Sequence, residues 1–541
     1  MIHPDNKTID VVFNEAIEQY PDNLFLMVPG DPERSYRPQG YQITYQAASN
    51  TVEQIKDLLS TAGYGHGHRI AILLENRPEF VFVKLACNSL GISIVPINPD
   101  YRPAEIAYLL QDSLSDLVIY LDPRKELIVT SLEESGLQIP STSLDSMWGG
   151  LPAAETAPPE HGPIHGDTEA SLLYTSGTTG RPKGCRMGHE YELMLGYWYV
   201  TRGGYLTFEE GKERLLNPLP LFHVNAGIVS LWGMVLTGNC QIQPERFSPD
   251  KWWPSIRETE ATMVHYLGAV VPILMNTQPS AEDKNHKVRM GIGAGLEPTL
   301  HQPFEERFGF PLVEIWGMTE FCRILADCHD PRQIDTRAIG RPQLGLDVRV
   351  VDQNDQDVAV GESGEMLVRH SAETPRKWAF LGYLNKPEAT AEAWRGGWFH
   401  TGDTVKQDET GMIYFVDRKK NIIRRSGENI AAAEIEAVIQ GHPAVGQVAA
   451  LAVADKLRDE EVFTCIVLAA GFEPNVETAR AIFDDCFKQL AYYKAPGWLL
   501  FVENLPVTGT QKVVKHKIFA EDVDPTQISG VFDFRQLKKR G

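Results

Sequence analysis

The stretch Tyr174–Gly184, with the sequence YTSGTTGRPKG, has the residue types that bind phosphate. Glycines let the backbone approach a ligand closely, and consecutive N–H groups in such a turn form an anion-binding concavity. Hydroxyl side chains add donors, and Lys183 adds a positive charge. This is not a Walker loop, because Pro182 stands where that motif has its second glycine. A mobile surface turn is the alternative, but Leu172 and Leu173 favour a buried strand that leads into a phosphate-binding loop.

Two further motifs supply oxygen ligands. In Trp316–Glu320, WGMTE, the Thr319 hydroxyl could reach a phosphate, and the Glu320 carboxylate is the kind of ligand that Mg²⁺ prefers. In Trp398–Asp403, WFHTGD, an ionised Asp403 could accept hydrogen bonds from both hydroxyls of a ribose. A single glutamate is weak evidence for a metal, and Gly-Asp is also common in β-turns. Together the motifs indicate a nucleotide site.

Three more motifs have a plain structural interpretation beside a functional one. His223, in PLFHV, follows a buried strand, where a lone histidine is usually a core residue. Gly293–Pro298, GAGLEP, is either an ordinary strand-to-helix turn or a turn with space for a flat ligand. Thr508–Lys515, TGTQKVVK, holds the two competing cations Lys512 and Lys515, and a solvated basic run, the plain alternative, fits Lys515 and Lys517 better.

The elements that must position these motifs follow from the apolar pattern. Strands and helices alternate through residues 69–121, which favours a parallel sheet with right-handed crossovers. Later buried strands end at the polar motifs, and α/β sheets bind ligands at the carboxyl ends of their strands. Alternating strands after about residue 345 predict a β-rich subdomain, and a small α+β domain follows the charged stretch Asp417–Lys420. We expect an α/β N-terminal domain of residues 1–417 and a mobile C-terminal domain of residues 418–541.

Composition narrows the class of protein. A chain of 541 residues is too long for one hydrophobic core, and a net charge of −21 does not attract nucleic acid. Seven cysteines without a CxxC pair indicate reduced thiols in a cytoplasmic protein, without a disulfide framework or a zinc site. We expect neither a signal peptide nor a membrane span. The end Leu537–Gly541 is basic and carries no peroxisomal address.

In type and order, these motifs resemble those of the adenylate-forming superfamily, which includes acyl-CoA synthetases, luciferases and peptide-synthetase adenylation domains. The resemblance covers nearly the whole chain, and the middle looks most like the carnitine/crotonobetaine-CoA ligase group. It implies an AMP-forming acyl-CoA synthetase that activates a carboxylic acid with ATP, releases pyrophosphate and transfers the acyl group to coenzyme A. The implied cofactors are ATP, Mg²⁺ and CoA. The acid is expected to be larger than acetate, because Gly317 stands where acetate-specific members have a tryptophan.

The resemblance also implies roles for single residues. Lys512 would be the catalytic lysine, although Gln511 replaces a glycine that many relatives have before it. Thr319, Glu320 and His223 would be catalytic too, Glu320 as the magnesium ligand and His223 as the aromatic gate of the acyl pocket. The residues implied in ATP binding are Thr175, Ser176, Gly177, Thr178, Thr179, Gly180, Lys183, Gly293, Ala294, Gly295, Glu314, Trp316, Gly317, Thr319, Asp403, Arg418 and Lys512.

In the look-alike family the small domain rotates between the two steps. Lys420 would then mark the hinge, and Ser426 and Gly427 would face CoA. Aromatic residues in the middle of the chain are candidates for the acyl-pocket wall, where they would favour a trimethylammonium acid. These residues are Trp198, Tyr199, Trp232 and Tyr266.

Other functions stay open at this point. The same family includes enzymes that load an acid onto a carrier-protein thiol, here in trans, and luciferase-type oxidases. A non-catalytic nucleotide-binding regulator is a third alternative, against which intact Lys512, Glu320 and Asp403 argue. The expected partners are the acid, ATP and CoA, with a second copy of the chain in a homodimer and no nucleic acid.

Overall fold

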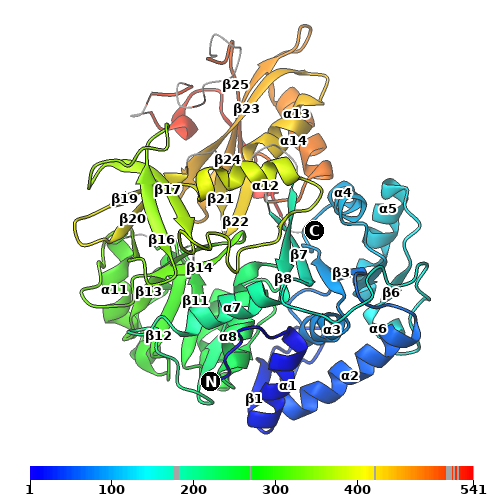
Figure 1. Ribbon diagram of the computed structural model, residues 1–541. Helices are drawn as coiled ribbons and strands as arrows, with labels where there is room; N and C mark the ends of the chain where they lie inside the picture. The colour runs from blue at the N-terminus through cyan, green and yellow to red at the C-terminus, as the bar shows by residue number, and fades with distance from the viewer. Residues whose placement is uncertain are drawn as a thin grey trace.

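The computed structural model describes residues 1–175, 182–268, 270–296, 298–418, 422–506, 515, 518–520 and 523–539. They form a large N-terminal domain and a smaller C-terminal domain, which stands above the other layers in Figure 1. The predicted α/β fold class is confirmed. The predicted boundary between residues 417 and 418 stays a prediction.

A seven-stranded sheet contains the strand that leads to the phosphate-loop motif, in the order β18-β8-β7-β4-β3-β5-β6. Its strands are β3 (Arg69–Leu73), β4 (Ser93–Pro96), β5 (Leu117–Tyr120), β6 (Ser141–Ser143), β7 (Glu169–Thr175), β8 (Lys183–Gly188) and β18 (Gly382–Tyr383). β3 pairs in parallel with both β4 and β5, as the alternation in residues 69–121 predicts. β7 and β8 are antiparallel, so their ends at the motif lie together.

An eight-stranded sheet has the order β14-β13-β12-β11-β9-β10-β1-β2. Its strands are β1 (Leu24–Val28), β2 (Tyr41–Thr44), β9 (Arg214–Leu216), β10 (Cys240–Ile242), β11 (Met263–Leu267), β12 (Met290–Ala294), β13 (Leu312–Met318) and β14 (Phe321–Ala326). β11, β12 and β13 pair in parallel, so their carboxyl ends share one edge. The motifs PLFHV, GAGLEP and WGMTE follow or end strands of this sheet.

The expected β-rich subdomain is a five-stranded sheet in the order β15-β20-β19-β17-β16. Its strands are β15 (Ala338–Gly340), β16 (Asp347–Val351), β17 (Ser363–Arg369), β19 (Phe399–Gln407) and β20 (Ile413–Arg418). The pairings are antiparallel. The Thr-Gly-Asp motif lies inside β19 rather than in a free loop.

Helices cover and separate the two large sheets. In the N-terminal domain they are α1 (Ile9–Gln19), α2 (Tyr45–Thr61), α3 (Pro78–Ser89), α4 (Pro103–Ser113), α5 (Lys125–Ser135), α6 (Leu144–Met147), α7 (His189–Val200), α8 (Leu231–Leu236), α9 (Pro249–Thr259), α10 (Val270–Met275), α11 (Pro298–Phe308) and α12 (Pro387–Ala393). α7 contacts β7 and β8 of one sheet and β14 of the other, so it lies between them (Figure 1). No helix in the described part of the chain combines the length and apolarity of a membrane span.

A buried ion pair joins the helices between the sheets. Nζ of Lys84, on α3, donates to Oε1 of Glu192 on α7 at 2.8 Å and to Oγ of Ser171 on β7 at 2.8 Å. The indole N–H of Trp232, on α8, donates to the other oxygen of Glu192 at 2.8 Å. Both charges are thus paired and hydrogen-bonded, which burial of a charge requires.

The C-terminal domain has its own sheet and core. The strands are β21 (Ile422–Arg425), β22 (Glu428–Ala431), β23 (Val445–Asp455), β24 (Asp459–Leu468), β25 (Trp498–Phe501) and β26 (Phe532–Asp533), with helices α13 (Ala432–Gln440) and α14 (Val476–Gln489). The apolar faces of α13 and α14 pack with β21, β24 and β25 in a core of buried side chains from Ile423 to Phe534.

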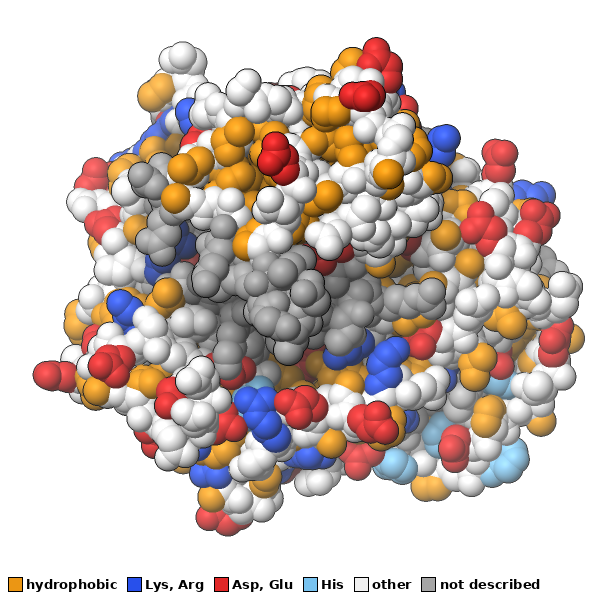
Figure 2. Space-filling view, turned by 90° about the horizontal axis from the view of Figure 1, so that it is seen from above, with side chains coloured by type: hydrophobic (Ala, Val, Ile, Leu, Met, Phe, Trp, Pro, Cys, Tyr) orange, Lys and Arg blue, Asp and Glu red, His pale blue; other side chains and the backbone are white. Residues whose placement is uncertain are grey.

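The face of the molecule seen in Figure 2 mixes acidic, basic and apolar side chains.

All seven cysteines lie in the described part of the chain, where they are unpaired and buried. Burial raises the pKa of the Cys87 and Cys240 thiols to about 12. Both side chains therefore stay protonated and pack as small apolar groups.

A buried lysine joins the two domains. Nζ of Lys494, in the C-terminal domain, donates to Oε1 of Glu105 on α4 at 2.6 Å and to Oε1 of Glu434 on α13 at 2.9 Å. Burial opposes the charge of Lys494, but the two carboxylates outweigh it and hold its pKa well above the ordinary value. Nearby, Nδ2 of Asn98 donates to the hydroxyl of Tyr493 at 2.9 Å. The contact between the domains is therefore specific and polar.

Replacing Lys494 by methionine should destabilise the protein strongly. Two buried carboxylates would lose their cation, which costs about 3–5 kcal/mol of unfolding free energy. Thermal and denaturant unfolding measure the loss, and Lys488→Met, at an exposed lysine of α14, is the matched control. Equal unfolding curves for the two variants would contradict this role for Lys494.

Candidate functional site

A cavity of about 990 Å³ lies between the domains and brings most of the predicted motifs together. From the N-terminal domain it is lined by Thr175, Lys183, His223, Gly317, Thr319, Glu320 and Gly402, among others. From the C-terminal domain it is lined by Arg425, Ser426, Gly427, Glu428, Leu457 and Tyr492–Lys494. Motifs that are far apart in the sequence thus face one space.

The phosphate-loop motif enters the cavity from the ends of β7 and β8. Thr175 and Lys183 are opposite each other in the ladder, and both line the cavity. Nζ of Lys183 lies 4.8 Å from the centre of the Tyr383 ring. The predicted residues of the loop itself lie outside the described residues, and their role stays a prediction. They are Ser176, Gly177, Thr178, Thr179 and Gly180.

Thr319 and Glu320 lie at the turn between β13 and β14. The hydroxyl of Tyr191, on α7, donates to the backbone carbonyl of Thr319 at 2.8 Å, which fixes this turn against the helix. The hydroxyl of Tyr383 donates to Oε1 of Glu320 at 2.9 Å. Burial and the Glu320 carboxylate raise the pKa of the Tyr383 hydroxyl, so that it stays protonated and acts as a donor. No sequence pattern marks Tyr383, because β18 has only 2 residues.

Two predicted nucleotide residues contact each other. The indole N–H of Trp316, on β13, donates to Oδ2 of Asp403, on β19, at 2.8 Å, and both side chains are buried. Arg418 is opposite Asp403 in the β19–β20 ladder. The pair therefore joins the eight-stranded sheet to the β-rich subdomain beside the cavity, where Gly402 is a lining residue.

Glu314 is buried behind the cavity and holds the GAGLEP turn. Its Oε1 accepts from the hydroxyl of Tyr266 at 2.6 Å, and its Oε2 accepts from the N–H of Gly295 at 3.0 Å. Gly295 has φ +80°, where an L side chain is strained. Gly293, Ala294 and Gly295 are not among the described residues that line the cavity, so their predicted contact with ATP stays a prediction.

Burial raises the pKa of Glu314 to about 7, against an ordinary 4.5. Between these values the folded state holds a proton that the unfolded state has lost, so stability falls as the pH rises. Relative to Glu314→Gln, the wild type should lose on the order of 3 kcal/mol of unfolding free energy between about pH 4.5 and pH 7. Unfolding curves over this range measure it, with Glu306→Gln, at an exposed carboxylate, as the control. Parallel curves for all three proteins would refute the shift.

The C-terminal domain contributes a hairpin tip, residues 425–428, to the cavity. Ser426 and Gly427 have φ of +50° and +89°, and the residues on either side of them are paired. Positive φ at both central residues is the condition for a type I′ turn. A Cβ on Gly427 would lie 2.2 Å from Cδ1 of Leu267, on β11. The tip is therefore packed directly against the N-terminal domain.

The hairpin tip also brings titratable groups together. Oε2 of Glu428 lies 3.5 Å from Nε2 of His223, whose ring packs on that of Phe222 with the centroids 4.6 Å apart. His223 is thus a cavity residue and not a core histidine. Lys420 and Lys512 lie outside the described residues, so the hinge and the catalytic lysine stay predictions.

The four aromatic candidates for the acyl-pocket wall do not converge on the cavity, because none of them is among its lining residues. The guanidinium of Arg202 packs on the ring of Trp198, 3.7 Å from the ring centre. The hydroxyl of Tyr199 forms a hydrogen bond with Nε2 of His265 at 2.7 Å. Trp232 donates to Glu192, and Tyr266 donates to Glu314. These side chains have their partners inside the fold, which residue type alone cannot reveal.

Comparison with known proteins identifies the family. A profile of the AMP-binding enzyme family matches residues 13–384, and one of the AMP-binding enzyme C-terminal domain matches residues 434–512. Since the first match alone spans more than half of the 541 residues, the chain belongs to the AMP-binding enzyme family. The predicted family and the predicted enzyme class, an AMP-forming ligase, are confirmed.

The chain is also similar to individual members. It is 29% identical to a crotonobetaine/carnitine–CoA ligase of Salmonella arizonae over 494 residues, 88% of this chain and 92% of that protein. A double mutant of o-succinylbenzoate CoA synthetase from Bacillus subtilis, bound to its product analogue OSB-NCoA, aligns with a TM-score of 0.81 at 24% identity, over 95% of this chain and 98% of that one. The same enzyme in complex with AMP aligns with a TM-score of 0.64 at 24% identity, over 94% of this chain and 98% of that one. The fold of this chain therefore superposes better on the first structure than on the second.

Proposed function

We propose that this chain is an AMP-forming acyl-CoA ligase. The carboxylate of an acid would attack the α-phosphorus of ATP, giving an acyl-adenylate and pyrophosphate. The CoA thiolate would then attack the acyl carbon and release AMP. The observation that carries the proposal is the shared cavity, in which the hairpin tip faces the phosphate-loop strands and Glu320. The names of the similar ligases support CoA as the acceptor.

The first step needs positive charge and donors around the phosphates. Lys183 and Thr175 are suited to this at the ends of β7 and β8, and Thr319 lines the same cavity. Preorganised groups of this kind supply the largest part of many rate enhancements. The family resemblance adds Lys512 to them, and it assigns the nucleoside to Asp403 and its neighbours.

The residues present fit a magnesium ion at Glu320. Mg²⁺ is usually held by one or two carboxylates together with substrate phosphates and water, not by a cage of protein ligands. Glu320 lines the cavity, and the described residues contain no group of three or more potential metal ligands. When bound there, the ion would neutralise phosphate charge. The hydrogen bond from Tyr383 orients the carboxylate.

The second step would use the hairpin tip, with Ser426 and Gly427 beside the CoA thiol. Gly427→Ala should slow thioester formation from premade acyl-adenylate by roughly tenfold or more, because the new Cβ meets Leu267 at positive φ. Pyrophosphate release should persist. Gly471→Ala is the matched control, since Gly471 has φ +92° in the same domain with nothing within 4 Å.

Both half-reactions are measured separately, with ATP and a panel of acids. Equal effects of the two glycine variants on thioester formation would contradict the role of the hairpin tip. A wild-type protein that releases no pyrophosphate with short, medium, aromatic or quaternary-ammonium acids would contradict the function itself.

The acid is proposed to be larger than acetate. Gly317 lines the cavity, its backbone is not in the left-handed region, and a Cβ there would meet nothing closer than 3.8 Å. The glycine is therefore not required by backbone geometry, and it leaves space for an acyl chain. Phe222, Val270 and Ile273 are apolar residues on the lining of the same cavity.

Gly317→Trp should shift the preference toward acetate or propionate while the protein stays folded. Gly317→Ala should retain the wild-type preference, because its Cβ has room. Relative kcat/KM values across acids of increasing length are the measurement. A soluble tryptophan variant with an unchanged length profile would show that chain length is determined elsewhere.

A cytoplasmic location is proposed as well, supported by seven unpaired, buried thiols. The homodimer expected from the sequence remains a proposal that sedimentation can test.

A further inference from the structure

One lysine of the basic chain end is buried. The side chain of Lys538 is 0% exposed, whereas that of Lys539 is exposed. The two family profiles end at residues 384 and 512, so this segment lies beyond both. Lysine is almost never fully buried unless it is paired. The partners of Lys538 therefore indicate what the segment does.

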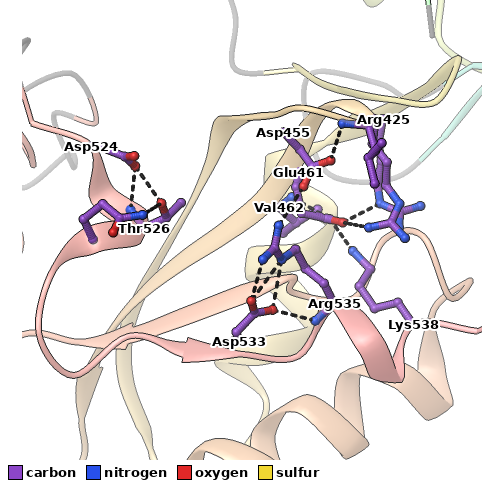
Figure 3. A network of polar contacts seen from close by, with 12 residues as sticks. Arg425, Asp455, Glu461, Val462, Asp524, Thr526, Asp533, Arg535 and Lys538 are labelled. Atoms are coloured by element: carbon purple, nitrogen blue, oxygen red, sulfur yellow. Dashed lines mark hydrogen bonds and ion pairs between the residues drawn. The ribbon is translucent and has the colours of Figure 1, made fainter. Parts of the chain in front are cut away.

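The tail, defined as residues 532–539, is packed onto the C-terminal domain. β26 pairs with β25, and the buried ring of Phe534 stacks on that of Phe483, on α14, with centroids 4.9 Å apart. These contacts place the basic residues that follow next to β23 and β24 (Figure 3).

Two basic side chains of the tail hold the turn between β23 and β24 from both of its strands. Nη1 of Arg535 donates to Oδ2 of Asp455, the last residue of β23, at 3.0 Å. Nζ of Lys538 donates to Oε1 of Glu461, on β24. Residues 456–458 form the turn between these anchors, and the two contacts are seen together in Figure 3.

The anchored turn also contacts the hairpin tip. Nε of Arg425 donates to Oε2 of Glu461 at 2.8 Å, so the carboxylate is shared between the tail and the tip. The N–H of Ser426 donates to the backbone carbonyl of Arg458, in the turn, at 2.9 Å. Arg425 is also opposite Asp459 in the β21–β24 ladder. The tip thus rests on the turn through both side chain and backbone.

Glu461 uses its two oxygens for two different tasks. Oε1 accepts from Lys538 and from the N–H of Val462, the latter at 2.8 Å. Oε2 accepts from Arg425 and also lies 3.6 Å from Nη1 of Arg458, in the turn. The carboxylate is 0% exposed, and a buried charge that loses one partner is costly. Without Lys538 the carboxylate is expected to turn, and Arg425 to move with it.

We propose that the tail is a positioning element for the hairpin tip. Arg535 and Lys538 fix the β23–β24 turn and the orientation of Glu461, which hold Arg425 and Ser426 in place at the cavity. The consequence for CoA transfer rests on the proposed function, whereas the coupling between tail and tip does not.

The test is amide hydrogen exchange in full-length variants at about pH 6, below the value of about 7 to which burial lowers the pKa of Lys538. Lys538→Met should speed exchange in β21 and β22 roughly tenfold, the factor that corresponds to about 1.4 kcal/mol. Exchange in α14 should stay as in the wild type. Lys539→Met, the same substitution at the exposed neighbour, is the control and should change neither.

A second variant distinguishes a local effect on the hairpin from a general loss of folding. Arg535→Gln removes the other anchor from a partly exposed position and should speed exchange in the same two strands. Unchanged exchange in β21 and β22, or an equal rise in α14, would overturn the proposal.

The activity readout separates this proposal from the proposed function. In Lys538→Met, the KM for CoA should rise while pyrophosphate release is kept. If the wild type forms no CoA thioester, the proposed function fails, and the exchange data still decide the role of the tail.

Discussion

Gly427 lies so close to Leu267 that a Cβ would overlap the leucine side chain, and this contact places the hairpin tip of the C-terminal domain directly against β11. The hairpin tip reaches the N-terminal domain in a turn with positive φ at both central residues. With the tip in place, Glu428 comes to His223, and Arg425 lines the space from the side of the small domain. A displaced tip would leave one side of the cavity without its wall.

Buried charges specify this arrangement more than they stabilise it. Lys494 is paired with Glu105 of the N-terminal domain and Glu434 of the C-terminal domain, so its environment depends on both. Glu461 likewise takes cations from three places in the chain, which are Arg425 on β21, Arg458 in the β23–β24 turn and Lys538 in the tail. A buried ion pair adds little net stability over an apolar contact, but a broken one is expensive. Arrangements of the two domains that leave Lys494 or Glu461 without its partners are therefore strongly disfavoured.

Local sequence pattern was enough to predict the elements around the site. The alternation in residues 69–121 indicated the parallel sheet, and the apolar pair before Thr175 indicated the strand β7. Motifs that end strands were expected to converge, and Thr175, His223 and Glu320 do line one cavity. Contacts between distant segments could not be predicted. Tyr383 reaches Glu320 from a strand of 2 residues, too short for a pattern.

Two other side chains show the same limit. Trp198 was a candidate for the acyl wall, yet cations inside the fold pack on its ring. Lys538 belongs to a basic run at the end of the chain, and it is buried because Glu461, 77 residues earlier, lies within its reach. Residue type describes what a side chain can do, whereas its partner decides what it does.

In the folded chain the buried cysteine thiols are unreactive toward thiol-directed reagents. A thiol reacts as its thiolate, and burial raises the pKa of Cys322, Cys465 and Cys486 to about 12. A thiol-directed reagent therefore modifies the protein only as fast as a region opens. Because Cys465 and Cys486 lie in the C-terminal domain and the others in the N-terminal domain, the order in which peptides become labelled would reveal which domain opens first.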